Sequence, residues 1–198
     1  MIPEEVRQNL ISDDAAFNAM YPDDIRELSG EHWTPLEVAK TAAEYLVNRP
    51  GIKVLDIGSG VGKFCSIGAI STQGHFTGAE YRENLVDLSK RYAKQLGLAN
   101  VEFIHSNITQ ISFKEYQAFY FFNSFIENMS KTEVMDDAVP VSPRHYSRYT
   151  QHLREQLAGM PIGTRLVTYW SNADEVPRGY VIQATAFEGE LKMWEKLF

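Results

Sequence analysis

The sequence has little of what builds disulfide-linked, membrane-spanning or strongly basic proteins. It contains a single cysteine, Cys65, so no disulfide framework is expected. It has no run of about 18 apolar residues, the length that a membrane-spanning helix needs. The formal net charge of -7 at pH 7 argues against a large basic surface for phosphate backbones. We therefore expect a reducing compartment and no membrane. Nucleic acid is disfavoured as a partner, although a local basic patch is compatible with this net charge.

Signals for metal binding and secretion are also missing. No His and Cys residues stand at the spacings of a metal site, so we expect no metal. The start of the chain, residues 1–5, lacks the basic residues and apolar run of a secretion signal, and we expect a cytoplasmic protein. At 198 residues, of which 44% are hydrophobic, the chain is long enough for a single domain, 1–198, with one sizeable core.

The most informative segment is a short apolar strand that runs into a glycine-rich turn. Residues 54–64 read VLDIGSGVGKF. Glycine adopts backbone angles closed to other residues, and its missing Cβ lets the main chain approach a ligand. A dinucleotide fingerprint would need a glycine in place of Lys63. A P-loop would need a glycine in place of Ile57 and a hydroxyl in place of Phe64, so neither phosphate motif is met.

The remaining pattern, D-x-G-x-G-x-G after a hydrophobic strand, resembles the first motif of the class I S-adenosylmethionine (SAM) dependent methyltransferases. The resemblance implies that the turn passes under the amino-acid part of SAM, and that the acid orients the turn and the charged end of the ligand. An ordinary strand-to-helix turn of another α/β protein is the alternative. The residues predicted to bind the cofactor here are Asp56, Gly58, Ser59, Gly60 and Gly62.

A second strand supplies the residue that a nucleoside site needs for ribose. About 20 residues past such a turn, an acid at a strand end accepts hydrogen bonds from the ribose hydroxyls. The alternating segment 75–80 ends on Glu80, and the ring of Tyr81 follows it and would cover adenine. A solvated carboxylate at the strand end is the alternative.

The turn after the third strand, 101–105, is expected at the adenine. In the resembled family an acid here meets the adenine amino group, and the next backbone N–H reaches a ring nitrogen. This chain has Asn107 and Ile108 at these places. The asparagine departs from the acid but keeps a carbonyl acceptor. An asparagine that only stabilises its own turn is nearly as good an interpretation.

The fourth strand, 118–122, is apolar throughout, as a central parallel strand buried on both faces should be. Ligands collect at the carboxyl ends of such strands. We therefore expect Asn123 beside the cofactor, and Ser124 and Phe125 next to the transferred methyl group and its acceptor. Amino-methylating DNA enzymes of the resembled family carry Pro-Pro-aromatic here, which this chain lacks, so adenine in DNA is disfavoured as a substrate.

A weaker similarity links the chain to the Dot1-like lysine methyltransferases. It rests on Ser29-Gly30-Glu31, on the glycine turn and on Phe122-Asn123-Ser124-Phe125. Those enzymes have a Tyr-Gly-Glu-Thr run, whereas here Ser29 replaces the tyrosine and His32-Trp33 intervene before Thr34. We interpret the similarity as a shared SAM pocket and not as a shared substrate.

Residues 1–50 form a different kind of segment. Thr34-Pro35-Leu36-Glu37 matches a capping box that starts a helix to about Val47. We expect a helical N-terminal extension that is a possible lid over the ligand, with Trp33 and Thr34 near the substrate. A scaffold helix or an oligomer contact is an equal alternative, and the oligomeric state is not readable. A second possible lid is the loop 127–145.

The rest of the chain completes the sheet. A fifth strand is expected at 164–169, followed by Trp170 at the acceptor pocket, and a hairpin at 180–186 and 191–196. The expected fold is α/β: a Rossmann-like, doubly wound, seven-stranded mixed sheet with its last strand antiparallel. Residues 51–198 would form the SAM-binding core.

The leading hypothesis is a SAM-dependent methyltransferase that acts on an unidentified small molecule or protein side chain. The SAM sulfonium already makes its methyl group electrophilic, so the protein needs mainly to align a nucleophile and exclude water. No side chain is identified as a catalytic base. An NAD-linked oxidoreductase and a non-catalytic SAM-binding protein are the alternatives.

Overall fold

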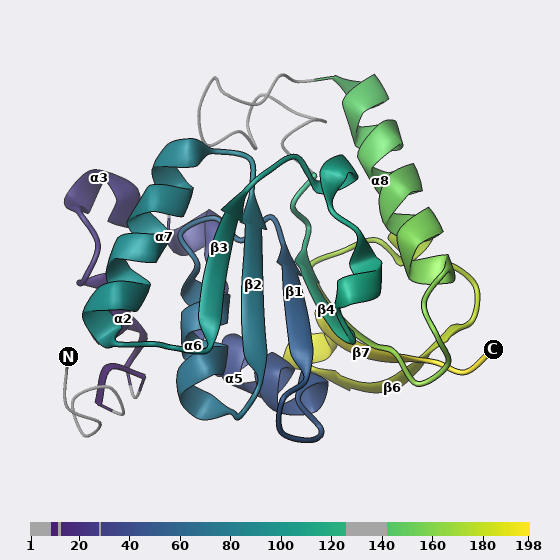
Figure 1. Ribbon diagram of the computed structural model, residues 1–198, viewed down its shortest axis with the longest axis horizontal. Coiled ribbons are helices and arrows are strands. Elements are labelled where there is room, and N and C mark those ends of the chain that lie inside the picture. Colours follow the sequence, from purple (N-terminus) through teal and green to yellow (C-terminus); the bar gives the residue numbers. More distant parts are fainter. Residues whose placement is uncertain (1–8, 12, 28, 126–141) are drawn as a thin grey trace.

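The computed structural model describes residues 9–11, 13–27, 29–125 and 142–198. Its strands, in chain order, are β1 (Lys53–Ile57), β2 (His75–Glu80), β3 (Val101–His105), β4 (Ala118–Phe122), β5 (Arg165–Tyr169), β6 (Tyr180–Ala186) and β7 (Leu191–Lys196). They form one seven-stranded sheet in the order β3-β2-β1-β4-β5-β7-β6 (Figure 1). The pairs from β3 to β5 are parallel, and β7 runs antiparallel to both of its neighbours. The predicted fold class is confirmed.

Helices cover both faces of this sheet. On one face pack α5 (Leu36–Leu46), α6 (Lys63–Ser71) and α7 (Glu83–Leu96), and on the other pack α8 (Pro143–Ala158) and two 3₁₀ turns. The turns are η1 (Ile108–Gln110) and η2 (Phe113–Glu115). The other described helical segments are α2 (Asp14–Asn18), α3 (Asp23–Arg26), α4 (Ser29–His32), η4 (Ala173–Glu175) and η5 (Phe187–Gly189).

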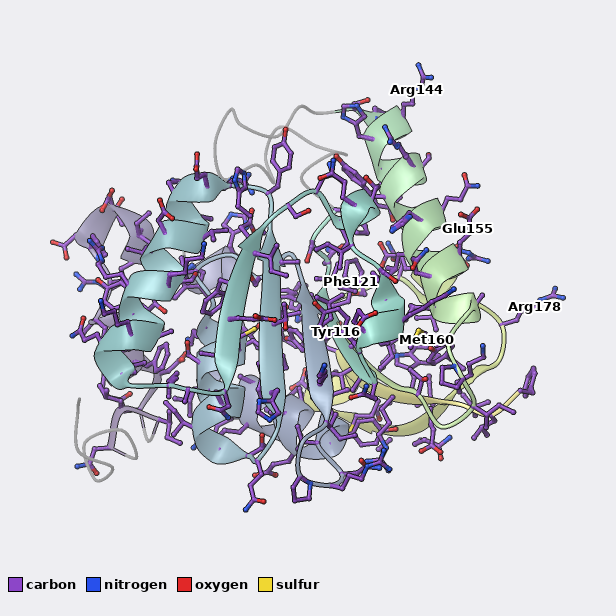
Figure 2. The ribbon with its side chains drawn as sticks, viewed as in Figure 1. Tyr116, Phe121, Arg144, Glu155, Met160 and Arg178 are labelled. Carbon is purple, nitrogen blue, oxygen red and sulfur yellow. The ribbon has the colours of Figure 1, made fainter. Side chains whose placement is uncertain are left out.

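The two halves of the core follow from the period of two along the strands. In β4, Tyr120 packs with α5 and α6, while Phe119 and Phe121 pack on the opposite face with α8. Figure 2 shows Phe121 inside the molecule, whereas Arg144 and Glu155 point outward from α8. A strand buried on both faces reads as a continuous apolar run, which is why β4 was recognisable.

The start of α5 differs from the prediction. The capping box at Thr34 is wrong, because α5 begins at Leu36 and the Thr34 hydroxyl instead forms a 2.9 Å hydrogen bond with the Tyr120 hydroxyl. The backbone N–H of Leu36 donates to Asp14 Oδ1, at 3.1 Å, so the first turn of α5 is capped from 22 residues upstream. A hydroxyl buried against β4 has a partner there and is not available to the helix.

The described part of the N-terminal extension packs on the glycine turn. Lys63, only 3% exposed, forms an ion pair with Asp14 and donates a 2.8 Å hydrogen bond to Asn18 Oδ1. Its Nζ also lies 5.8 Å from the centroid of the Trp33 ring. The Tyr21 hydroxyl donates to the backbone oxygen of Val61 at 3.1 Å. The segment therefore forms a wall of the turn, and its role as a lid stays a prediction.

Two other expectations, the loop at 127–145 and the absence of a membrane span, are compared with the described residues only. The loop predicted at 127–145 lies outside them except for its last part, residues 142–145. None of the described helices has the length and hydrophobicity that crossing a membrane requires.

Removal of the Lys63 ammonium should loosen the N-terminal wall. Lys63→Met keeps the buried aliphatic volume but loses the bonds to Asp14 and Asn18, so we expect faster limited proteolysis upstream of α5. The matched control is Lys40→Met, which loses only a surface ion pair with Glu37. If both variants are cleaved upstream of α5 as slowly as the wild type, the wall does not depend on this ion pair.

Candidate functional site

A cavity of about 600 Å³ opens at the carboxyl ends of the parallel strands, where the strand order reverses between β1 and β4. All the residues predicted to bind the cofactor or substrate line it except Gly62. They are Trp33, Thr34, Asp56, Gly58, Ser59, Gly60, Glu80, Tyr81, Asn107, Ile108, Asn123, Ser124, Phe125 and Trp170. The structure thus brings these residues together from six separate segments, and their binding roles remain predictions.

Each of the three glycines in the turn is required for a different structural reason. All have positive φ: 78° at Gly58, 52° at Gly60 and 75° at Gly62. A Cβ on Gly58 would lie 2.5 Å from the Cβ of Ser124, and one on Gly62 would lie 2.4 Å from the ring of Phe103. A Cβ on Gly60 would meet no atom within 4 Å. Gly60 therefore leaves space for a ligand, whereas Gly62 leaves space for the core.

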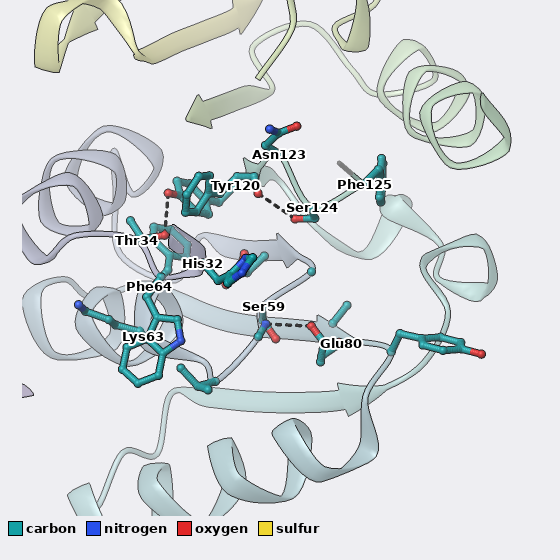
Figure 3. A pocket seen from close by; sticks show the side chains of 18 of the residues that line it. His32, Thr34, Ser59, Lys63, Phe64, Glu80, Tyr120, Asn123, Ser124 and Phe125 are labelled. Carbon is teal, nitrogen blue, oxygen red and sulfur yellow. Dashed lines mark hydrogen bonds between the residues drawn. The ribbon is translucent and has the colours of Figure 1, made fainter. Parts of the chain in front are cut away.

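Glu80 holds the glycine turn in place. One carboxylate oxygen accepts a 3.0 Å hydrogen bond from the backbone N–H of Gly60 in the glycine turn (Figure 3). The other accepts one of 2.9 Å from the backbone N–H of Arg82. The Arg82 guanidinium lies 3.7 Å from the same carboxylate. Each carboxylate oxygen has two acceptor sites, so both retain capacity for ribose hydroxyls. The carboxylate that would recognise ribose is also the one that positions the turn.

Asp56 is a buried carboxyl, 3% exposed, at the end of β1. Burial raises its pKa to about 7, and the nearby Glu80 carboxylate adds to the rise, while a hydrogen bond from the Cys65 thiol opposes it. That bond spans 3.4 Å between Sγ and Oδ2. Burial likewise raises the pKa of the Cys65 thiol, so the thiol stays protonated and serves as a donor. A ligand cation placed at Asp56 would favour its charged form.

The adenine end agrees in part with the expectation. Tyr81 is 50% exposed, so its ring is free to cover a ligand. Asn107 Oδ1 accepts hydrogen bonds from the Thr109 backbone N–H, at 3.0 Å, and the Thr109 hydroxyl, at 2.8 Å. Its Nδ2 donates to the Tyr149 hydroxyl at 3.0 Å. The carboxamide therefore stabilises its own turn, which was the alternative interpretation, and the adenine contact remains a prediction.

The cavity is also lined by side chains that were not predicted. Most are aromatic and lie within strands or helices, where the sequence pattern indicates core. The residues missed in this way are His32, Phe64, Tyr120, Phe122, His145, Tyr149 and Tyr169. A usable signal was the single hydroxyl, that of Tyr120, in an otherwise apolar strand, because a buried hydroxyl requires a partner.

Comparisons with known proteins agree with this site. Residues 48–143 match the family model of a methyltransferase domain. A 23S rRNA (uracil(1939)-C(5))-methyltransferase of Klebsiella pneumoniae is 28% identical over 111 residues, 54% of this chain and 25% of that protein. A demethylmenaquinone methyltransferase of Bacillus cereus is 30% identical over 69 residues, 34% of this chain and 29% of that protein. The chain thus spans less than a third of either relative's length.

Solved structures show the same fold. An RNA methyltransferase from Salinibacter ruber, in complex with S-adenosyl-L-homocysteine (SAH), has a TM-score of 0.61 at 20% identity, covering 83% of this chain and 93% of that one. A mutant of MtNAS in complex with SAM has a TM-score of 0.60 at 14% identity, covering 98% and 71%. Residues 48–143 therefore match a methyltransferase domain, and the chain has the fold of the class I SAM-dependent methyltransferases.

Alanine substitutions at Gly60 and Gly62 should show which glycine leaves space for a ligand and which leaves space for a core side chain. At Gly60 and Gly62 alanine carries the cost of a positive φ, about 1–2 kcal/mol. Only Gly62→Ala adds a clash with Phe103. Because each kcal/mol shifts Tm by about 2–4 °C in a domain of this size, we expect Gly62→Ala to melt several degrees below Gly60→Ala. Equal melting temperatures in thermal denaturation would contradict the assignment.

Asp56→Asn should change stability in a pH-dependent way. A carboxyl whose pKa rises on folding, here from 3.8 to about 7, stabilises the fold at low pH and loses this contribution as pH rises through the folded value. The amide has no such loss. We expect the variant to gain stability over the wild type between pH 5 and 8, measured by urea unfolding. The exposed Asp87→Asn is the control, and a constant difference for Asp56→Asn would refute the buried charge.

Proposed function

We propose that this chain binds SAM in the cavity and transfers its methyl group to an acceptor at the end of β4 and β5. The methionine end would lie on the glycine turn with its ammonium at Asp56, and the ribose at Glu80. The observation that carries the proposal is Gly60: its N–H is held by Glu80, and the space beyond its Cα is empty. The turn is thereby shaped for a ligand that approaches the main chain closely.

Two alternatives have less support. An NAD-linked oxidoreductase would need a glycine at position 63, where the buried Lys63 is fixed to α2 by Asp14. A role other than methyl transfer, including a non-catalytic one, is compatible with the fold, because a fold does not fix a function. The [4+2]-cyclase SpnF, an enzyme named for another reaction, matches the fold with a TM-score of 0.52 at 20% identity, covering 69% of this chain and 46% of that one. The methyltransferase family model at residues 48–143 favours methyl transfer.

The chain's own residues would bind, orient and exclude water. The SAM sulfonium supplies an electrophilic methyl group, so no protein nucleophile is needed. Asp56 would hold the ammonium group and Glu80 the ribose of the cofactor. The buried Thr34 and Tyr120 hydroxyls close the wall next to the glycine turn with their mutual hydrogen bond. The acceptor would enter at the carboxyl ends of β4 and β5, where Asn123 and Trp170 line the cavity.

The range of acceptors to be tested is wider than the negative net charge of the chain alone indicates. Similar proteins include an RNA methyltransferase and a 23S rRNA methyltransferase, so nucleic acid joins small molecules and proteins among the acceptors to be tested. A net charge of -7 does not exclude a local basic patch. Localisation in the cytoplasm remains part of the proposal, in line with the single buried thiol of Cys65.

Titration calorimetry with SAM, SAH and NAD tests the cofactor. We expect the two adenosyl-sulfur ligands to bind and NAD not to bind. Asp56→Ala and Glu80→Ala should each weaken SAH binding by about tenfold or more, equivalent to about 1.4 kcal/mol. The exposed Glu83→Ala should bind normally. Binding of NAD alone, or normal SAH affinity in both site variants when they are folded, would overturn the proposal.

A further inference from the structure

Asp56 occupies a position in β1 where the strand pattern calls for an apolar residue. Alternate residues of this strand belong to opposite halves of the core: Val54 packs with α5 and α6, whereas Leu55 packs on the other face. By the same alternation the Asp56 side chain points toward α6. Its register partners are Gly78 in β2 and Tyr120 in β4. A carboxyl at this point of the core requires a specific reason.

The groups that surround this carboxyl are mostly apolar. Asp56 is 3% exposed, and its neighbours Cys65 and Tyr120 are 0% and 1% exposed. The Phe64 ring stacks on the Tyr120 ring, with the two centroids 3.8 Å apart. Burial among such groups raises the pKa of Asp56 to about 7. A charged carboxylate is therefore costly here unless a donor or a cation reaches it.

A thiol from α6 is the donor that reaches Asp56. Cys65 Sγ lies 3.4 Å from Asp56 Oδ2, and among the described residues this is the only hydrogen bond to the Asp56 side chain. Cys65 is the third residue of α6, so the glycine turn brings the thiol back to the end of β1. Lys63, which begins α6, forms its ion pair with Asp14 instead. The thiol therefore acts on one oxygen of the carboxyl group.

The other oxygen of Asp56 is left to the cavity. Asp56 lines the cavity, and its Oδ1 accepts no hydrogen bond from a described residue. Oδ1 is not one of the unpartnered side-chain atoms that are fully buried, so it keeps some exposed surface. The two oxygens thus have different surroundings: Oδ2 contacts the thiol, and Oδ1 is open to a ligand.

The described titratable groups that act on Asp56 come from three elements: Cys65 from α6, Glu80 from β2 and Tyr120 from β4. The Glu80 carboxylate raises the pKa of Asp56 by repulsion. Burial raises the pKa of the Cys65 thiol and of the Tyr120 hydroxyl, so both groups stay neutral. None of these three groups is a cation. A cation carried by a ligand would therefore be the partner that Oδ1 requires.

We propose that Cys65 is a positioning residue for the cofactor: its thiol holds Asp56 Oδ2, so that Oδ1 presents a negative charge to the ammonium group of SAM or SAH. This inference rests on the proposed function, which places that ammonium at Asp56. The thiol is fully buried and itself touches no ligand. It acts by favouring the charged form of Asp56 and by fixing which oxygen faces the cavity.

Titration of SAH across pH tests this role. Between about pH 5.5 and 7.5 the SAH affinity of the wild type should rise as Asp56 loses its proton. Cys65→Ala removes the donor, so the midpoint of the rise should move up by about half a pH unit, with SAH bound about threefold more weakly at pH 6. Cys65→Ser supplies a stronger donor, so the midpoint should move down by about as much.

Two controls assign the effect to Asp56 and to the ammonium group. Methylthioadenosine keeps the adenosine and the sulfur of SAH but has no ammonium group, so its affinity should be equal in the wild type and in both Cys65 variants. Asp56→Asn should bind SAH weakly and without the rise, which distinguishes Asp56 from Glu80 as the titrating group. Thermal denaturation shows whether each variant is folded, and the serine variant decides alone if the alanine variant is not.

A purely structural role for Cys65 gives a different result. It would weaken the binding of SAH by the same factor at every pH, and that of methylthioadenosine with it. This result, or a midpoint that the serine variant leaves unchanged or moves up, would overturn the inference. Failure of the proposed function is seen separately, as a wild-type protein that binds no SAH at any pH or as an Asp56→Asn variant that binds it normally.

Discussion

The bond from Gly60 N–H to the Glu80 carboxylate is the contact on which the site depends. It joins the turn after β1 to the end of β2, and two further bonds, from Gly58 and Ser59 N–H to the Ala79 oxygen, hold the same turn. Because these bonds hold the turn against β2, the turn does not fill the cavity at the carboxyl ends of β1 and β4. Loss of Glu80 would therefore disturb the geometry of the turn and also remove the proposed ribose contact, so truncation alone does not separate the two effects.

The wall that the N-terminal extension forms on the glycine turn depends on a buried ion pair. Lys63 begins α6, directly after the glycine turn, and its ammonium is buried. Burial lowers its pKa, and the Asp14 carboxylate opposes that shift. Because the same Asp14 oxygen also caps the first turn of α5, a single carboxylate connects α2, α5 and α6. The N-terminal wall and the glycine turn therefore belong to one network of hydrogen bonds and ion pairs.

The sequence patterns predicted the sheet well, because strands and turns depend on local sequence. They also selected residues that line one cavity, although the binding roles of these residues remain predictions. Apolar runs, period-two alternation and turn residues placed β6 and β7 at their observed bounds. Predictions failed where a partner lies far along the chain: Thr34 bonds to Tyr120, 86 residues away, in place of capping α5. Spacing also did not distinguish Gly60, which borders the cavity, from Gly62, which accommodates Phe103. The aromatic lining was missed since rings in apolar strands are typical of core.

Three residues that line the cavity carry features that cost stability. Asp56 is a carboxyl in a place that disfavours its charge, Asn123 holds a buried oxygen without a described donor, and Trp170 holds a strained backbone. None of these features stabilises the fold. Replacement by a residue chosen for stability alone would remove all three. Their presence at one edge of the sheet therefore argues that the cavity is kept for binding, and it does so independently of the glycine motif.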